Sequence, residues 1–213
     1  MNDLPLDPEP ALGWRAWRLE RRRDGLRLIS LTRNDAWPAR TAMRARCDLA
    51  AHDPVPSVGC SCGLYAAREP EDLSQAGVGA YNASVVGSVA MWGRVIEHEF
   101  GSRSQNAYPA RFRLVCGPCL GEGRGAVEPI LVFARSAALV CACATHAGGV
   151  ADVLDARQVQ SELLSTYAVD VLPIERVREA LKTPPPTEPI RMRPVLEAAA
   201  AGVLLMFAPR LAS

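Results

Sequence analysis

All seven cysteines of the chain fall between residues 47 and 143, and two of the three histidines lie within five residues of a cysteine. Thiolates and imidazoles at such short spacings are the ligands that a tetrahedral zinc ion prefers, because two ligands on one turn can occupy neighbouring corners of the tetrahedron. A chain of this kind has to fold so that each group comes together. The first group is Cys47, His52, Cys60 and Cys62, and the second is Cys116, Cys119, Cys143 and His146. The sequence therefore predicts one or two structural zinc ions.

The exact ligand sets stay open at this point. Cys141 could replace Cys143 in the second group, although its place within an apolar run also suits a buried thiol. A mixed site could instead combine the thiols at positions 60 and 62 with those at 116 and 119. With four protein ligands no coordination position remains for water, so we expect any zinc ion here to be structural and not catalytic.

Cys116-Gly-Pro-Cys119 has the four letters of the thioredoxin redox motif, in which a helix follows the first thiol and activates it. Three glycines, at positions 121, 123 and 125, follow here and disfavour a helix, and Val115 stands where that family has tryptophan. The pattern favours a metal-binding turn, with thiol redox chemistry at Cys116 and Cys119 as an alternative.

Composition adds limits on the compartment and the partner. The formal net charge of +1 in 213 residues argues against a general binder of polyanions, even though nearly all basic residues are arginine. The chain shows no leader pattern of a basic stretch followed by an apolar one, and no apolar run of about 18 residues. We therefore expect a cytoplasmic protein, in which thiols stay reduced and are free to bind metal.

The hydrophobic patterning predicts an α+β fold, a zinc-stabilised and mainly antiparallel β domain with C-terminal helices. Alternating residues on both sides of Asp24-Gly25 predict a β-hairpin. We further expect strands over 84–96 and 110–115, with a polar turn over 101–106 between them. Short helices are expected over 39–46 and 69–76. Toward the C-terminus we expect a helix over 150–167, an extended segment over 169–172 and a helix from Pro173.

These elements suggest five segments. They are a flexible N-terminus at 1–11, a β-rich zinc domain at 12–146, a helical extension at 147–182, a proline-rich linker at 183–193 and an apolar terminal helix at 194–213. The apolar residues between 194 and 208 need burial, so this helix could bind a protein partner or a second copy of the chain. A membrane surface is less favoured, because basic flanking residues are sparse.

Between positions 65 and 108 the chain combines aromatic rings with guanidinium and imidazole groups. Nucleic-acid and nucleotide sites use this combination, since guanidinium binds phosphate and an aromatic face stacks on a base. The candidate ligand-binding residues are Tyr65, Trp92, Arg94, His98, Arg103 and Tyr108. We predict a non-catalytic binding module for nucleic acid or a nucleotide-bearing partner. The alternatives are an enzyme that uses His98 with Glu97 or Glu99 on a nucleotide substrate, and an interaction scaffold that acts through the last helix.

Three phrases carry a resemblance to a known family. They are Gly13-Trp-Arg-Ala-Trp-Arg18, Cys60-Ser-Cys-Gly-Leu-Tyr-Ala66, and Trp92-Gly-Arg-Val-Ile-Glu-His-Glu99 with Ala107-Tyr-Pro109. Over residues 12 to 146 the chain resembles an uncharacterised zinc-binding-like protein family of high-GC Gram-positive bacteria. The resemblance implies such a host and no particular activity.

Overall fold

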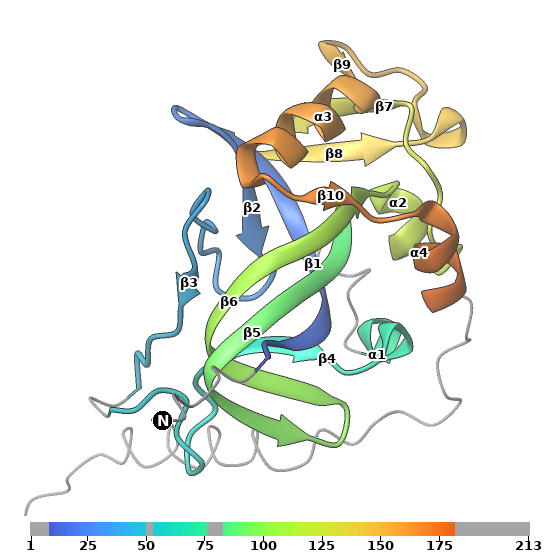
Figure 1. The fold of residues 1–213 in the computed structure, drawn as a ribbon. Helices are drawn as coiled ribbons and strands as arrows, with labels where there is room; N and C mark the ends of the chain where they lie inside the picture. The colour runs from blue at the N-terminus through green and yellow to red at the C-terminus, as the bar shows by residue number, and fades with distance from the viewer. Residues whose placement is uncertain (1–8, 50–52, 76–82, 182–213) are drawn as a thin grey trace, which may run out of the picture.

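The computed structural model describes residues 9–49, 53–75 and 83–181 (Figure 1). The dominant element of this part of the chain is one ten-stranded sheet, with a few short helices around it. Among the described strand pairs only β6 with β10 is parallel, and all others are antiparallel. The prediction of a mainly antiparallel β fold with helices is confirmed.

The predicted N-terminal hairpin is present. Strands β1 (Ala11–Arg22) and β2 (Gly25–Ser30) pair in register from Trp17↔Ser30 to Arg22↔Gly25. Gly25 has a φ of 105°, a left-handed conformation that glycine adopts without steric cost. Because side chains alternate along a strand, the hairpin buries one face, which includes Trp17 and Leu28, in the core.

Four strands close on themselves around the core. Strand β5 (Val85–His98) pairs with both β1 and β6 (Gly101–Leu114), and β4 (Leu64–Ala67) pairs with β6 and, through Trp14↔Ala67, with β1. The long β5–β6 ribbon bends strongly (Figure 1), and its register shifts at Ser88/Val89 and Trp92/Val95. Such bulges bend and twist a ribbon. The four strands therefore form a closed and strongly bent arrangement.

Two local predictions are wrong. Residues 101–106 form the start of β6 and not a polar turn, and the turn of this hairpin lies at Glu99 and Phe100. The polar side chains there sit on a strand that pairs with β5 on one side and β4 on the other. Residues 39–46 are not helical: they contain β3 (Met43–Arg44), which pairs with β6. Helix propensity differences of a few tenths of a kcal/mol per residue are easily overridden by such pairing.

Helix α1 (Pro70–Gln75) lies within the predicted range 69–76. The later part of the chain adds helix α2 (Gly117–Gly121) and strands β7 (Leu131–Arg135), β8 (Ala138–Ala142) and β9 (Val153–Asp155). Helix α3 (Ala156–Tyr167) begins six residues later than predicted, because Asp155 caps it by accepting hydrogen bonds from the backbone amides of Arg157 and Gln158. Strand β10 (Asp170–Val171) and helix α4 (Ile174–Ala180) follow, with Pro173 at the start of α4 as predicted.

The helices share their cores with the sheet. Val159, Leu163 and Tyr167 of α3 are buried in the same cluster as Trp17 and Phe112 of the strands. Ile174 and Val177 of α4 belong to a second cluster with residues of α1, β1 and β5. The predicted helical extension therefore packs directly on the β domain. The linker over 183–193 and the helix over 194–208 lie outside the described residues.

No helix in the described ranges combines the length and the apolar character that crossing a membrane requires.

Candidate metal centres

Four soft donors meet at one point of the structure, where the ends of α2 and β8 come together. The donor atoms of Cys116, Cys119, Cys143 and His146 all lie within 4.8 Å of one another. Nδ1 of His146 is 3.5, 3.4 and 3.5 Å from the sulfurs of Cys116, Cys119 and Cys143, respectively, and the sulfurs of Cys119 and Cys143 are 3.7 Å apart. We call this group the first cluster; it could hold a metal ion.

Local backbone structure explains why these residues converge. Cys116 precedes α2 directly and Cys119 lies within it, so the two thiols are three residues apart on one helical turn. Cys143 precedes the 3-10 turn Ala144–His146, where residues three apart eclipse each other. The short helix α2 departs from the expected glycine-rich turn: Pro118 suits its first turn, and it ends at Gly121.

The choice between Cys141 and Cys143 has a clear geometric answer in the structure. Cys141 lies within β8, pairs with Val132, is fully buried in the main core and donates its backbone N–H to Oγ of Ser84. Cys143 comes just after the last residue of β8 and turns toward His146. Cys141 therefore acts as a small core residue, and Cys143 belongs to the first cluster.

Without a bound metal ion, the thiols of the first cluster differ widely in pKa. Burial raises the pKa of the Cys119 thiol to about 12 and also raises the pKa of Cys116. Burial acts in the same direction on Cys143, but its hydrogen bonds with His146 and Cys116 outweigh burial and lower its pKa to about 6. The metal-free cluster thus favours a single thiolate, so that a metal ion has to displace the remaining protons.

Glu122 supports the first cluster from outside and was not recognised from the sequence. It follows α2 directly, and its Oε1 lies 3.2 Å from Nε2 of His146, the ring nitrogen that does not face the thiols. A carboxylate in this position orients a metal-binding imidazole and fixes its tautomer.

The second cluster consists of Cys47, Cys60 and Cys62, whose sulfurs lie within 4.8 Å of one another. The sulfurs of Cys47 and Cys60 are 3.7 Å apart, and the sulfur of Cys62 accepts a hydrogen bond from the backbone N–H of Ser57 at 3.5 Å. His52, the fourth predicted ligand, lies outside the described residues. The two clusters hold separate sets of thiols, so the mixed combination of Cys60 and Cys62 with Cys116 and Cys119 is not formed.

Arg103 braces the loop that carries Cys60 and Cys62. It is 3% exposed, and its Nη1 donates to the backbone carbonyls of both cysteines, at 2.9 Å for Cys62. Its Nε donates to Nε2 of His98 at 2.9 Å. Gly63 has a φ of 131°, and a Cβ there would lie 3.0 Å from Cβ of Arg103, so glycine allows the loop to approach this arginine closely.

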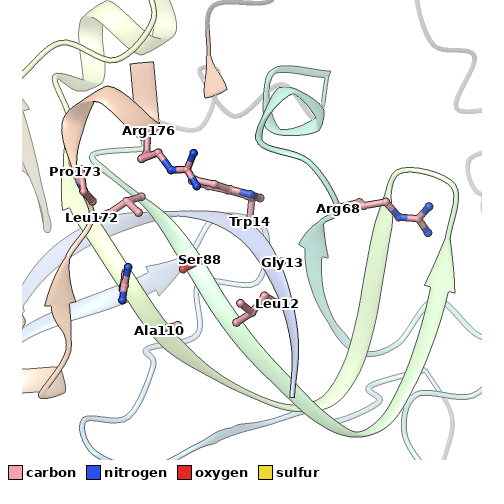
Figure 2. A pocket seen from close by; sticks show the side chains of 10 residues that line it. Leu12, Gly13, Trp14, Arg68, Ser88, Ala110, Leu172, Pro173 and Arg176 are labelled. Carbon is pink, nitrogen blue, oxygen red and sulfur yellow. The ribbon is translucent and has the colours of Figure 1, made fainter. Parts of the chain in front are cut away.

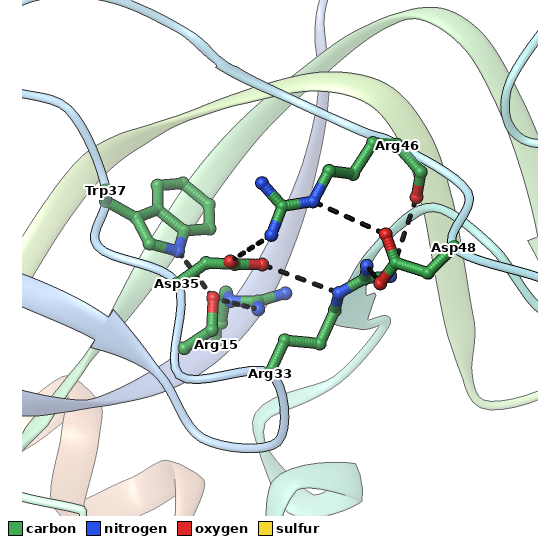
Figure 3. Close-up of polar contacts among 7 residues, drawn as sticks. Arg15, Arg33, Asp35, Trp37, Arg46 and Asp48 are labelled. Carbon is green, nitrogen blue, oxygen red and sulfur yellow. Dashed lines mark hydrogen bonds and ion pairs between the residues drawn. The ribbon is translucent and has the colours of Figure 1, made fainter.

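The two chain neighbours of Cys47 belong to a closed ring of alternating charges (Figure 3). Asp35 accepts from Arg46 at 2.7 Å and lies 3.4 Å from Arg33; Asp48 pairs with the same two arginines, at 3.5 Å for Arg46. Arg46 and Asp48 are the two chain neighbours of Cys47, so the ring ties this thiol to the turn after β2. Nothing in the residue spacing points to this arrangement, because the two halves lie in separate loops.

The predicted ligand-binding residues are only partly brought together. Tyr65 and Arg103 are direct partners across β4 and β6, and Arg103 reaches His98. Tyr108 lies five residues farther along β6, about 16 Å away, where its hydroxyl donates to the carbonyl of Tyr167. Arg94 is exposed on β5, and Trp92, two residues before it, is half-buried. Ligand binding by this set stays a prediction.

No protein-family model, curated protein or solved structure matches this chain.

Proposed function

We propose that this chain is a non-catalytic binding module stabilised by two structural zinc ions. The first would be held by Cys116, Cys119, Cys143 and His146. The second would be held by Cys47, Cys60 and Cys62, with His52 as the fourth ligand. The module would present its β surface to a nucleotide-bearing partner.

The observation that carries the zinc assignment is the spacing of the donor atoms. A tetrahedral zinc ion with Zn–S bonds of about 2.3 Å and Zn–N bonds of about 2.0–2.1 Å places two sulfurs about 3.8 Å apart, and sulfur about 3.6 Å from nitrogen. The first cluster has a sulfur–sulfur distance of 3.7 Å and sulfur–nitrogen distances of 3.4–3.5 Å. Cys47 and Cys60 in the second cluster show the same 3.7 Å spacing.

The donor set also supports zinc over harder cations. Thiolate and imidazole ligands suit zinc, whereas magnesium and calcium select oxygen. In the first cluster four protein donors would complete a tetrahedron around the ion, which supports a structural ion with no position for a reacting water.

The surroundings of the candidate catalytic groups favour a module without chemistry of its own. His98 accepts a hydrogen bond from Arg103 through Nε2, so the lone pair that a general base needs is already engaged with a cation. Cys116 is fully buried and burial raises its pKa, whereas a redox-active thiol is exposed and has a lowered pKa.

Metal analysis of the full chain, purified without chelator, tests this proposal. We expect about two zinc ions per chain. Cys119→Ser should lose about one ion, from the first cluster, and Cys60→Ser should lose about one ion, from the second cluster. Less than about 0.3 equivalents in the unmodified protein would contradict the proposal. So would a full metal content in both variants.

A further inference from the structure

A pocket of about 650 Å³ lies where strands β1, β5 and β6 meet the segment that leads into α4 (Figure 2). Its volume falls within the range of small-molecule sites, about 300–1,000 Å³. None of the clustered cysteines or histidines lines it. The lining residues that matter for recognition are Leu12, Trp14, Arg68, Ser88, Arg111 and Arg176.

The floor of the pocket is a row of side chains across three strands. Trp14 of β1 is directly opposite Ser88 of β5, and Ser88 is directly opposite Arg111 of β6. Directly opposite residues in antiparallel strands point to the same face and lie about 4.5–5.5 Å apart. An indole ring, a hydroxyl and a guanidinium group are therefore presented side by side on one surface.

The wall opposite this row comes from the β10–α4 connection. Leu172 and Pro173 supply apolar surface, and Arg176 extends from the first turns of α4 (Figure 2). Leu172 is held in place because its backbone N–H donates to the carbonyl of Phe112 at 3.0 Å. The wall is therefore fixed to β6, the strand that carries Arg111.

The lining carries three arginines and no carboxylate. Arg68 is engaged, since its Nη2 donates to the carbonyl of His98 at 2.8 Å. Arg176 lies 4.0 Å from Glu179, but both side chains are more than 70% exposed, and such pairs contribute little. Among the described residues the side chain of Arg111 makes no hydrogen bond or ion pair. Two guanidinium groups are thus available to an anionic ligand.

We propose that this pocket binds a mononucleotide, with its phosphate on Arg111 and Arg176 and its base against the indole of Trp14. Guanidinium groups bind phosphate in bidentate fashion, and an indole face can stack on any of the bases. The pocket is partly open to solvent, and its volume of about 650 Å³ suits a single nucleotide. This inference deepens the proposed function by naming the ligand class, and it places binding on residues other than Arg103 and Tyr108.

Titration calorimetry on the zinc-loaded full chain at low ionic strength tests the pocket, with AMP, ATP, adenosine and inorganic phosphate as probes. We expect saturable binding of AMP or ATP, and weaker binding of adenosine and of phosphate, each of which keeps only part of the contacts. Arg111→Ala and Arg176→Ala should each weaken nucleotide binding by about tenfold or more. Arg178→Ala is the matched control, because Arg178 is exposed on the same helix and does not line the pocket; it should change affinity by less than about twofold.

Three results would overturn the inference. They are no saturable binding of either nucleotide, an equal loss of affinity in Arg178→Ala and Arg111→Ala, or phosphate binding as tightly as AMP. Zinc content is measured on every sample. A full zinc content without nucleotide binding refutes the pocket and leaves the zinc-stabilised module in place, whereas missing zinc refutes the module itself.

Discussion

Oε1 of Glu122 lies 3.2 Å from Nε2 of His146, while Nδ1 of the same ring faces three thiols at 3.4–3.5 Å. Both ring nitrogens of this imidazole therefore have polar partners. A proton on Nε2, donated to the carboxylate, leaves Nδ1 as the lone pair that a metal ion needs.

Replacing Glu122 with glutamine should weaken metal retention at the first cluster without unfolding the chain. The amide keeps the size of the side chain but loses the charge that favours a proton on Nε2, so we expect about 10- to 100-fold lower zinc affinity. Competition with a chromophoric chelator measures this change. Glu175→Gln, at an exposed site in the first turn of α4, is the control. An equal affinity in both variants would show that Glu122 does not act on His146.

Cys141 and Cys143 provide a matched pair of cysteines two residues apart. Cys143→Ser should lose about one zinc ion per chain, because it removes a ligand. Cys141→Ser should keep both ions and instead lower the free energy of unfolding by about 1–3 kcal/mol, because it buries a hydroxyl in an apolar core. Metal analysis and denaturant unfolding of the two variants separate these effects. Loss of zinc in Cys141→Ser alone would reverse the assignment.

Arg103 is expected to be structural. In Arg103→Ala the carbonyls of Cys60 and Cys62 lose their buried donor, which should cost about 3 kcal/mol in the free energy of unfolding and weaken zinc binding at the second cluster. Arg94→Ala, at an exposed position on β5, should change stability by less than about 0.5 kcal/mol. Denaturant unfolding and zinc content are the measurements. Similar stability of the two variants would contradict the bracing role.

Tyr167 should make stability depend on alkaline pH. Its hydroxyl donates to the carbonyl of Trp37 at 2.8 Å and accepts from the backbone N–H of Leu28 at 3.0 Å, and burial raises its pKa to about 12. The unfolded chain ionises this group near pH 10, so the contribution of the neutral phenol is complete below about pH 10 and is lost as the pH rises toward 12.

Tyr167→Phe tests this expectation. At pH 8 the variant should be less stable by about 1–3 kcal/mol, because two buried backbone groups lose their partner. Above pH 10 the difference should shrink by about 1.4 kcal/mol per pH unit. Denaturant titrations at pH 8 and pH 11 provide the comparison, and an unchanged difference between them would argue against the role of the hydroxyl.

Local patterns predicted several elements well. The Asp24-Gly25 turn between alternating runs, the helix start at Pro173 and the β-branched run from Val85 depend on residues close in sequence, and each appears in the structure. The turn over 101–106 failed for the opposite reason. Ser102, Arg103 and Ser104 look like turn residues, but pairing with two neighbouring strands satisfies their backbone and covers their side chains.

The sequence by itself determined which thiols and imidazoles are available and how they are paired in short motifs, because ligands two or three residues apart share a turn whatever the rest of the fold does. Only the tertiary structure decided which motifs meet. Cys141 and Cys143 are two residues apart, so an uninterrupted strand would direct both side chains to the same face. Strand β8 ends at Ala142, however, and this end separates the core residue Cys141 from the cluster residue Cys143. Likewise, the row of Trp14, Ser88 and Arg111 arises from strand register, a relation between segments that local spacing does not encode.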